Sequence, residues 1–114
     1  MRGEIALQKR NTFFLILLVV CITAFSFLPS LFNDFVDFDD PAYVTENREI
    51  QDISFRNLRK VFTSSYVGCY CPLPVLSCAV EYHLFKFNPF PYHLTNLLLH
   101  IIVTLMVFYF IYLI

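Results

Sequence analysis

The chain has 114 residues, of which 58% are hydrophobic and 18% aromatic, and its mean hydropathy is +0.63. These values lie beyond those of ordinary soluble domains and are typical of a membrane protein. The formal net charge is −1 and the cationic residues are few and scattered, so nothing supports nucleic acid as a partner.

Two apolar runs, within residues 12–31 and 92–114, are long enough to cross a hydrocarbon layer of about 30 Å at about 1.5 Å per residue. The second run reaches Ile114 without a charge, a glycine or a turn, so we expect the N-terminal part of a longer polytopic protein. We predict an all-α membrane protein with two transmembrane helices, 12–31 and 92–114. They are preceded by a cytoplasmic segment, 1–11, and joined by an extracytoplasmic loop, 32–91, that holds in-plane amphipathic helices.

The basic residues set the expected orientation. Arg2, Lys9 and Arg10 precede the first run, which predicts a cytoplasmic N-terminus, whereas residues 32–93 hold five Arg or Lys against eight Asp or Glu. The basic start and the small residues around Ala24 would also fit a cleavable signal peptide. The apolar run continues to Phe32, which is longer than a signal-peptide core and favours an uncleaved anchor.

Four carboxylates follow the first run directly, at Asp34, Asp37, Asp39 and Asp40. Acids at this spacing repel one another and are costly near hydrocarbon, and acidic residues contribute little to membrane orientation. The cluster therefore indicates a site for catalysis or for cation binding at the membrane surface. The alternative is a solvated acidic turn.

The loop should hold a short extended stretch and turn at residues 41–47 and then two helices. Ser54 is the expected N-cap of a helix over 54–62, in which Phe55, Leu58 and Phe62 share one face. The opposite side would carry three cations that meet lipid or donor phosphates, or that are simply solvated: Arg56, Arg59 and Lys60.

The second helix, over 74–86, should begin near Pro72 and Pro74. It would lie in the interface plane, and its apolar residues recur at helical spacing: Leu76, Val80, Leu84 and Phe87. Glu81 and Lys86 should lie elsewhere on its surface. The segment 88–91 then turns the chain into the second membrane helix.

The cysteines and the polar residues of the second span leave alternatives open. Cys21 is an apolar filler of the first helix, whereas Cys69, Cys71 and Cys78 lack a fourth ligand for zinc. A disulfide from Cys78 to Cys69 or Cys71, or three unpaired thiols, would fit. The second span carries a polar stripe at positions i, i+3 and i+7: His93, Asn96 and His100. Such a stripe faces a bundle interior or a wet cavity, with His93 hydrated and His100 in an inward structural hydrogen bond.

Four strings occur in an order that resembles a known family. They are residues 35–47 (FVDFDDPAYVTEN), 70–73 (YCPL), 84–89 (LFKFNP) and 92–100 (YHLTNLLLH). They look like the N-terminal part of GT-C-fold membrane glycosyltransferases with C-terminal tetratricopeptide repeats, which are similar to protein O-mannosyltransferases and to the transmembrane-and-tetratricopeptide-repeat proteins. The resemblance covers roughly residues 31–105.

The resemblance implies transfer of a sugar from a polyprenyl-phosphate carrier to a protein or glycan acceptor. The reaction would take place on the outer face of a bacterial inner membrane or an endoplasmic reticulum membrane. It makes Asp39 and Asp40 the essential acidic pair, with Asp39 favoured as general base, and Arg56, Arg59 and Lys60 candidates for the leaving phosphate. A divalent cation is an open possibility.

One departure from the family pattern is that relatives often have Arg where this chain has Cys71. That departure leaves room for a non-catalytic membrane module, such as a transporter segment or an assembly subunit, whose acidic loop binds a cation or a partner.

Overall fold

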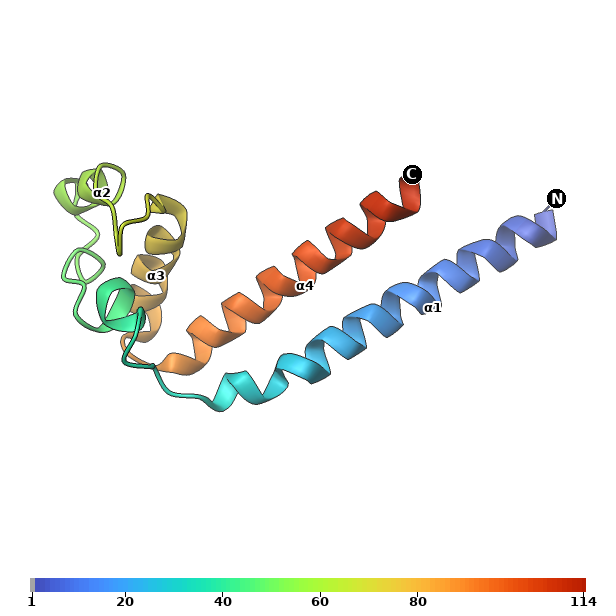
Figure 1. Ribbon diagram of the computed structural model, residues 1–114, viewed down its shortest axis with the longest axis horizontal. Helices are drawn as coiled ribbons and strands as arrows, with labels where there is room; N and C mark the ends of the chain where they lie inside the picture. The colour runs from blue at the N-terminus through green and yellow to red at the C-terminus, as the bar shows by residue number, and fades with distance from the viewer. Residues whose placement is uncertain (1) are drawn as a thin grey trace. The chain divides into compact units, whose positions relative to one another are not determined.

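The computed structural model describes residues 2–114, with side chains from Arg10 onward (Figure 1). Within these residues 71% are helical and none lies in a β-strand, which confirms the predicted all-α class. The main helices are α1 (Arg2–Phe27), α2 (Phe55–Val61), α3 (Pro72–Phe85) and α4 (Pro89–Leu113), with a 3₁₀-helix η1 (Leu28–Phe32) and a π-helical turn η2 (Pro41–Thr45).

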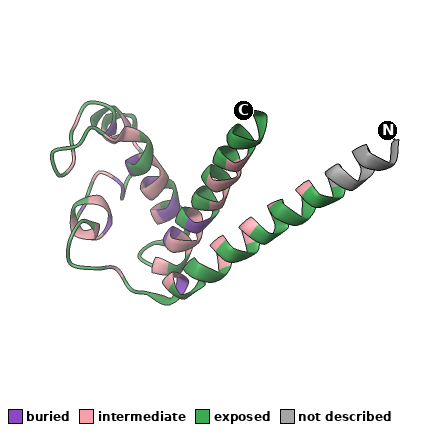
Figure 2. Cartoon of the chain, turned by 45° about the vertical axis from the view of Figure 1, so that its right-hand side comes forward, coloured by how far each residue is buried: buried purple, intermediate pink, exposed green. Residues whose placement is uncertain are grey.

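Two of these helical stretches are long and apolar enough to cross a membrane. They are Arg10–Phe32, with a mean hydropathy of 2.5, and Pro89–Leu113, with 2.2. Figure 2 shows that both are mostly exposed along their length. Helix α1 ends at Phe27 because Pro29, two residues later, has no backbone N–H to continue the α-helical hydrogen bonds, and the chain tightens into η1.

The chain divides into two compact units, which are described separately. One unit contains residues 1–31 and 93–114, and the other contains residues 32–92. The second unit is built around a small apolar core of six buried residues: Val44, Ile50, Val61, Val75, Ala79 and Tyr92.

Helix α2 begins where the sequence predicts. The hydroxyl oxygen of Ser54 accepts a hydrogen bond from the backbone N–H of Asn57, which satisfies one donor of the first turn. The predicted face is wrong, however, because Val61 is 2% exposed and packs in the core whereas Phe55 is 85% exposed. Phe55 therefore lies on the exposed side, with the cations.

Helix α3 begins at Pro72, as expected for a residue that needs no hydrogen-bond partner for a backbone N–H. Its core side is formed by Val75 and Ala79, four residues apart, whereas Leu84 is 66% exposed. Glu81 is buried, so its predicted surface position is wrong. It lies near the Cys78 thiol, one helical turn earlier, on a side of α3 that the apolar periodicity did not predict to be covered.

The turn between α3 and α4 is shorter than predicted. Helix α3 ends before Lys86, whose φ of +56° lies in the left-handed region. The side chain of Asn88 then accepts from the N–H of Phe90 at 3.2 Å, so Asn88 caps α4, and Pro89 is its first residue. The second long helix therefore starts at residue 89 instead of 92.

Candidate functional site

The acidic loop ends in a compact turn at Pro41–Thr45, where the sequence predicts a short extended stretch and a turn over 41–47. The carbonyl oxygen of Asp39 accepts from the N–H groups of Ala42 and Tyr43, both at 3.1 Å, and the N–H of Glu46 donates to Pro41 at 2.9 Å. Pro41 has the fixed φ that suits a first helical position, so it starts η2 directly after the acidic pair. Val44 is thereby carried into the core.

The two acids of the predicted pair have different environments. The Oδ2 atom of Asp40 accepts a hydrogen bond from the backbone N–H of Val36 at 2.7 Å, and the residue is half-buried. Asp39 is exposed, as are Asp34 and Asp37. The turn therefore holds one carboxylate against its own backbone and presents the other to solvent.

Tyr43 links the acidic turn to the cysteine segment. Its hydroxyl group donates to the carbonyl oxygen of Tyr66 at 3.2 Å and lies 3.3 Å from the Sγ atom of Cys71. The hydrogen bond with Cys71, together with burial and the nearby groups of Cys71, Cys69 and Asp39, raises the pKa of Tyr43 to about 12. Cys71 therefore belongs to the packing beneath the turn.

A tight hairpin presents Tyr66 to this network. Tyr66 and Cys69 exchange two backbone hydrogen bonds of 2.8 Å, around Val67 and Gly68 with φ of +50° and +76°. Two successive positive φ values match the primed turns that join antiparallel segments, although a β-branched residue such as Val67 is rare there.

The predicted phosphate-binding cations do not form one group. The Nζ atom of Lys60 lies 3.5 Å from Oε1 of Glu49, and the hydroxyl group of Tyr66 donates to Oε2 of the same carboxylate. Burial and this hydrogen bond raise the pKa of Tyr66. Arg56 and Arg59 remain on the exposed side of α2.

A hollow of about 470 Å³ adjoins the acidic turn. Its lining combines aromatic, acidic and cationic side chains: Phe38, Pro41, Ala42, Glu46, Asn47, Arg48, Glu49 and Tyr66. Asn47 is buried and holds the wall together, because its Nδ2 donates to the Tyr43 carbonyl at 3.4 Å and its Oδ1 accepts from the Glu49 N–H at 3.0 Å. Tyr43, Glu49 and Tyr66 were not predicted from the sequence, since their contacts join residues 17 to 28 positions apart. Asn47 was not predicted either, although its contacts are local. The triplet TEN at 45–47 could have indicated a turn at Asn47, because Asn is a common turn residue.

The three side chains of the predicted polar stripe line one pocket beside the second long helix. His93, Asn96 and His100 line the same pocket of about 220 Å³, together with Phe27, Ser30 and Leu97. The ring of His100 meets that of Phe27 edge-on, with 4.7 Å between centroids. An aromatic contact is thus the partner seen for the His100 ring, where the sequence predicted a hydrogen bond.

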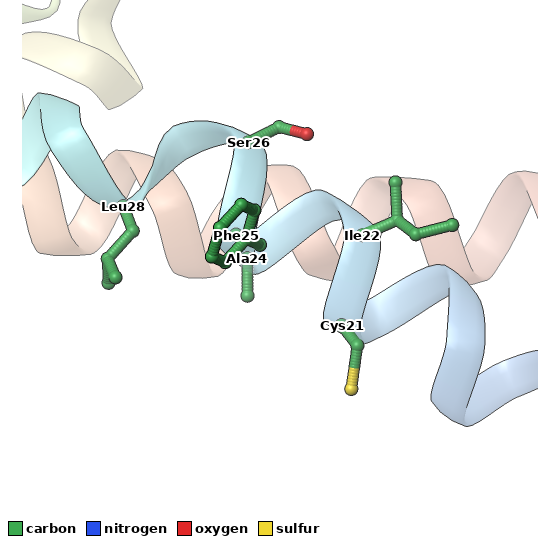
Figure 3. A pocket seen from close by; sticks show the side chains of 6 residues that line it. All are labelled: Cys21, Ile22, Ala24, Phe25, Ser26 and Leu28. Atoms are coloured by element: carbon green, nitrogen blue, oxygen red, sulfur yellow. The ribbon is translucent and has the colours of Figure 1, made fainter.

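An apolar groove of about 600 Å³ follows α1 (Figure 3). The side chains of Cys21, Ala24 and Leu28 point to the same side of the helix, in accordance with their spacing. Cys21 thus serves as an apolar surface residue.

All four cysteines are free thiols, so the unpaired alternative describes the structure. Burial raises the pKa of Cys78 to about 11, and Glu81, Asp40 and Cys71 add to the shift. Within the described part of the chain, no three His, Cys, Asp or Glu side chains are grouped to hold a metal ion.

Comparison with known proteins found no family model, no curated protein and no solved structure that matches this chain.

Proposed function

We propose that this chain is part of an integral-membrane glycosyltransferase that moves a sugar from a polyprenyl-phosphate donor to a hydroxyl group of a protein or glycan acceptor. The observation that carries the proposal is the division between the two acids: Asp40 is tied to Val36, whereas Asp39 is exposed beside it. A general base must reach solvent-borne substrate and must also be held in place, and this turn supplies both conditions.

In this reaction Asp39 takes the proton from the acceptor hydroxyl group. The acceptor oxygen then attacks C1 of the sugar, the bond from C1 to the phosphate oxygen breaks, and the polyprenyl phosphate leaves. The single displacement inverts the configuration at C1. Asp40 positions the turn, and the exposed Arg56 and Arg59 are the cations available to the leaving phosphate, because Lys60 is paired with Glu49.

The donor class is tested with the full-length protein in membranes, by supplying the same radiolabelled sugar on polyprenyl phosphate or on a nucleotide. The proposal expects transfer from the polyprenyl-linked sugar only. Transfer from the nucleotide sugar alone would assign the enzyme to another donor class, and transfer from neither would remove the enzymatic proposal.

One observation favours a second candidate, a non-catalytic membrane module. Cys71 stands where the resembling enzymes often carry Arg, and here its thiol lies against the Tyr43 hydroxyl group. A module of this kind would use the acidic loop to bind a cation or a partner. Calcium titration separates the two candidates. The module is supported if the wild type binds calcium saturably and transfers no sugar, and if both Asp39→Asn and Asp40→Asn abolish calcium binding.

A further inference from the structure

The pocket lined by the polar stripe contrasts with its surroundings. Helix α4 has a mean hydropathy of 2.2, yet His93, Asn96 and His100 all meet one pocket of about 220 Å³. Polar side chains within an apolar helix are costly and mark binding or transport sites by default. Their convergence on a single pocket indicates a ligand with several hydrogen-bonding atoms.

The donor chemistry of the pocket indicates an anion. Imidazole and amide N–H groups donate hydrogen bonds, and they come from three positions of α4. The Ser30 hydroxyl group already donates to the Phe27 carbonyl at 2.7 Å, so it orients the wall. Among the described residues that line the pocket there is no carboxylate that would repel an anion.

The shape of the pocket indicates a lipid. His93 lies in the second turn of α4 and His100 lies about 10 Å further along the helix axis. Phe27 and Leu97 add apolar walls beside these polar groups. A ligand with a polar head and an apolar chain matches both kinds of wall, whereas a free ion matches only one.

We propose that this pocket binds the phosphate monoester head of a membrane lipid, with Asn96 and His100 as donors to the phosphate oxygens. The polyprenyl phosphate released in the proposed reaction belongs to this class of lipid. The pocket contains neither Asp39 nor Asp40, so lipid binding here can be measured apart from sugar transfer. The proposal thus gives the polar stripe a ligand, in addition to the packing contact between the rings of His100 and Phe27.

The test is native mass spectrometry of the full chain in detergent micelles. The probes are dioleoyl phosphatidic acid, a polyprenyl monophosphate, dioleoylglycerol and inorganic phosphate. Both lipid phosphates should bind the wild type, and Asn96→Leu and His100→Leu should each weaken them by roughly tenfold, the loss expected for one hydrogen bond to a charged group. His100→Gln keeps a donor and should retain most of the binding.

Thr104→Val is the matched control. Thr104 lies on the same helix outside the pocket, where its hydroxyl group donates to the His100 carbonyl at 2.8 Å, and its replacement should leave binding unchanged. Circular dichroism shows whether each variant keeps its helices. Equal binding of dioleoylglycerol, or tighter binding of inorganic phosphate than of the lipids, would overturn the proposal, as would full binding by folded Asn96→Leu and His100→Leu.

Discussion

The carboxylate of Asp40 accepts a hydrogen bond from the backbone N–H of Val36 at 2.7 Å, which closes a loop of five residues that holds three of the four clustered acids. Asp39 lies within this loop and is exposed. The two adjacent acids thus differ, because Asp40 holds the backbone of the loop in place and Asp39 faces solvent.

Replacing Asp40 should loosen the loop, whereas replacing Asp37 should not. A hydrogen bond of this kind contributes about 1 kcal/mol, so Asp40→Ala should speed hydrogen exchange at the Val36 amide by roughly fivefold. Asp37→Ala is the matched control, since Asp37 is an exposed acid of the same loop. Unchanged exchange at Val36 in Asp40→Ala would contradict the assigned contact.

Cys69 and Cys78 of the loop unit should react with iodoacetamide in the order of their exposure. Cys69 is exposed, whereas Cys78 is half-buried with a pKa near 11 in place of 9.0, which leaves it about a hundredfold less thiolate below pH 9. Because its folded pKa lies above the unfolded value, the contribution of Cys78 to stability is complete below pH 9 and is lost as the pH rises toward 11. Mass spectrometry of the labelled sites checks the order of labelling, and urea unfolding at pH 8 and at pH 11 checks the loss of stability. Faster labelling of Cys78 than of Cys69 in the folded chain would refute the prediction.

Tyr43 should ionise at higher pH than an ordinary tyrosine. Its pKa of about 12 against 10.0 follows first from the contact with Cys71, so Cys71→Ala should lower that pKa. The stability that this shift contributes is present below pH 10 and is lost as the pH approaches 12. Ultraviolet titration of the wild type against Tyr43→Phe isolates this one hydroxyl group. A difference curve centred at pH 10 would show that the contact with Cys71 does not form.

The loop unit should depend on Ile50 far more than on an apolar residue outside its core. Ile50 is 0% exposed, so Ile50→Ala should cost about 2–5 kcal/mol of unfolding free energy, whereas Leu84→Ala, at a 66% exposed position, should cost less than about 0.5 kcal/mol. Urea-dependent labelling of Cys78 reports the opening of this unit. Equal midpoints for the two variants would place the core elsewhere.

The features predicted correctly from the sequence are those fixed by local chemistry. The two long apolar helices, the Ser54 cap and the start of α3 at Pro72 each depend on a few neighbouring residues.

The features predicted wrongly depend on contacts between distant residues. Glu81 is buried by packing that its own helix does not encode, and the core selects Val61 over Phe55. For residues 41–47 the sequence predicts a short extended stretch and a turn, and only the extended part is wrong, because Pro41–Thr45 forms a π-helical turn. The contacts of Tyr66 with Glu49 and of Tyr43 with Cys71 likewise join residues that no spacing rule connects.

The most direct test of the central claim is the turnover of Asp39→Asn in the full-length protein, with a polyprenyl-phosphate sugar donor and at matched membrane expression. Asn keeps the size and most hydrogen bonding of Asp39 and removes only the charge, so we expect a loss of roughly 10²–10⁴-fold. Asp34→Asn and Asp37→Asn, which replace two other exposed acids of the cluster, should stay near wild type. If the single variants Asp39→Asn and Asp40→Asn both keep near-wild-type turnover, the acidic cluster is a solvated turn and not the catalytic base. Loss confined to Asp34→Asn or Asp37→Asn would move the base to that residue.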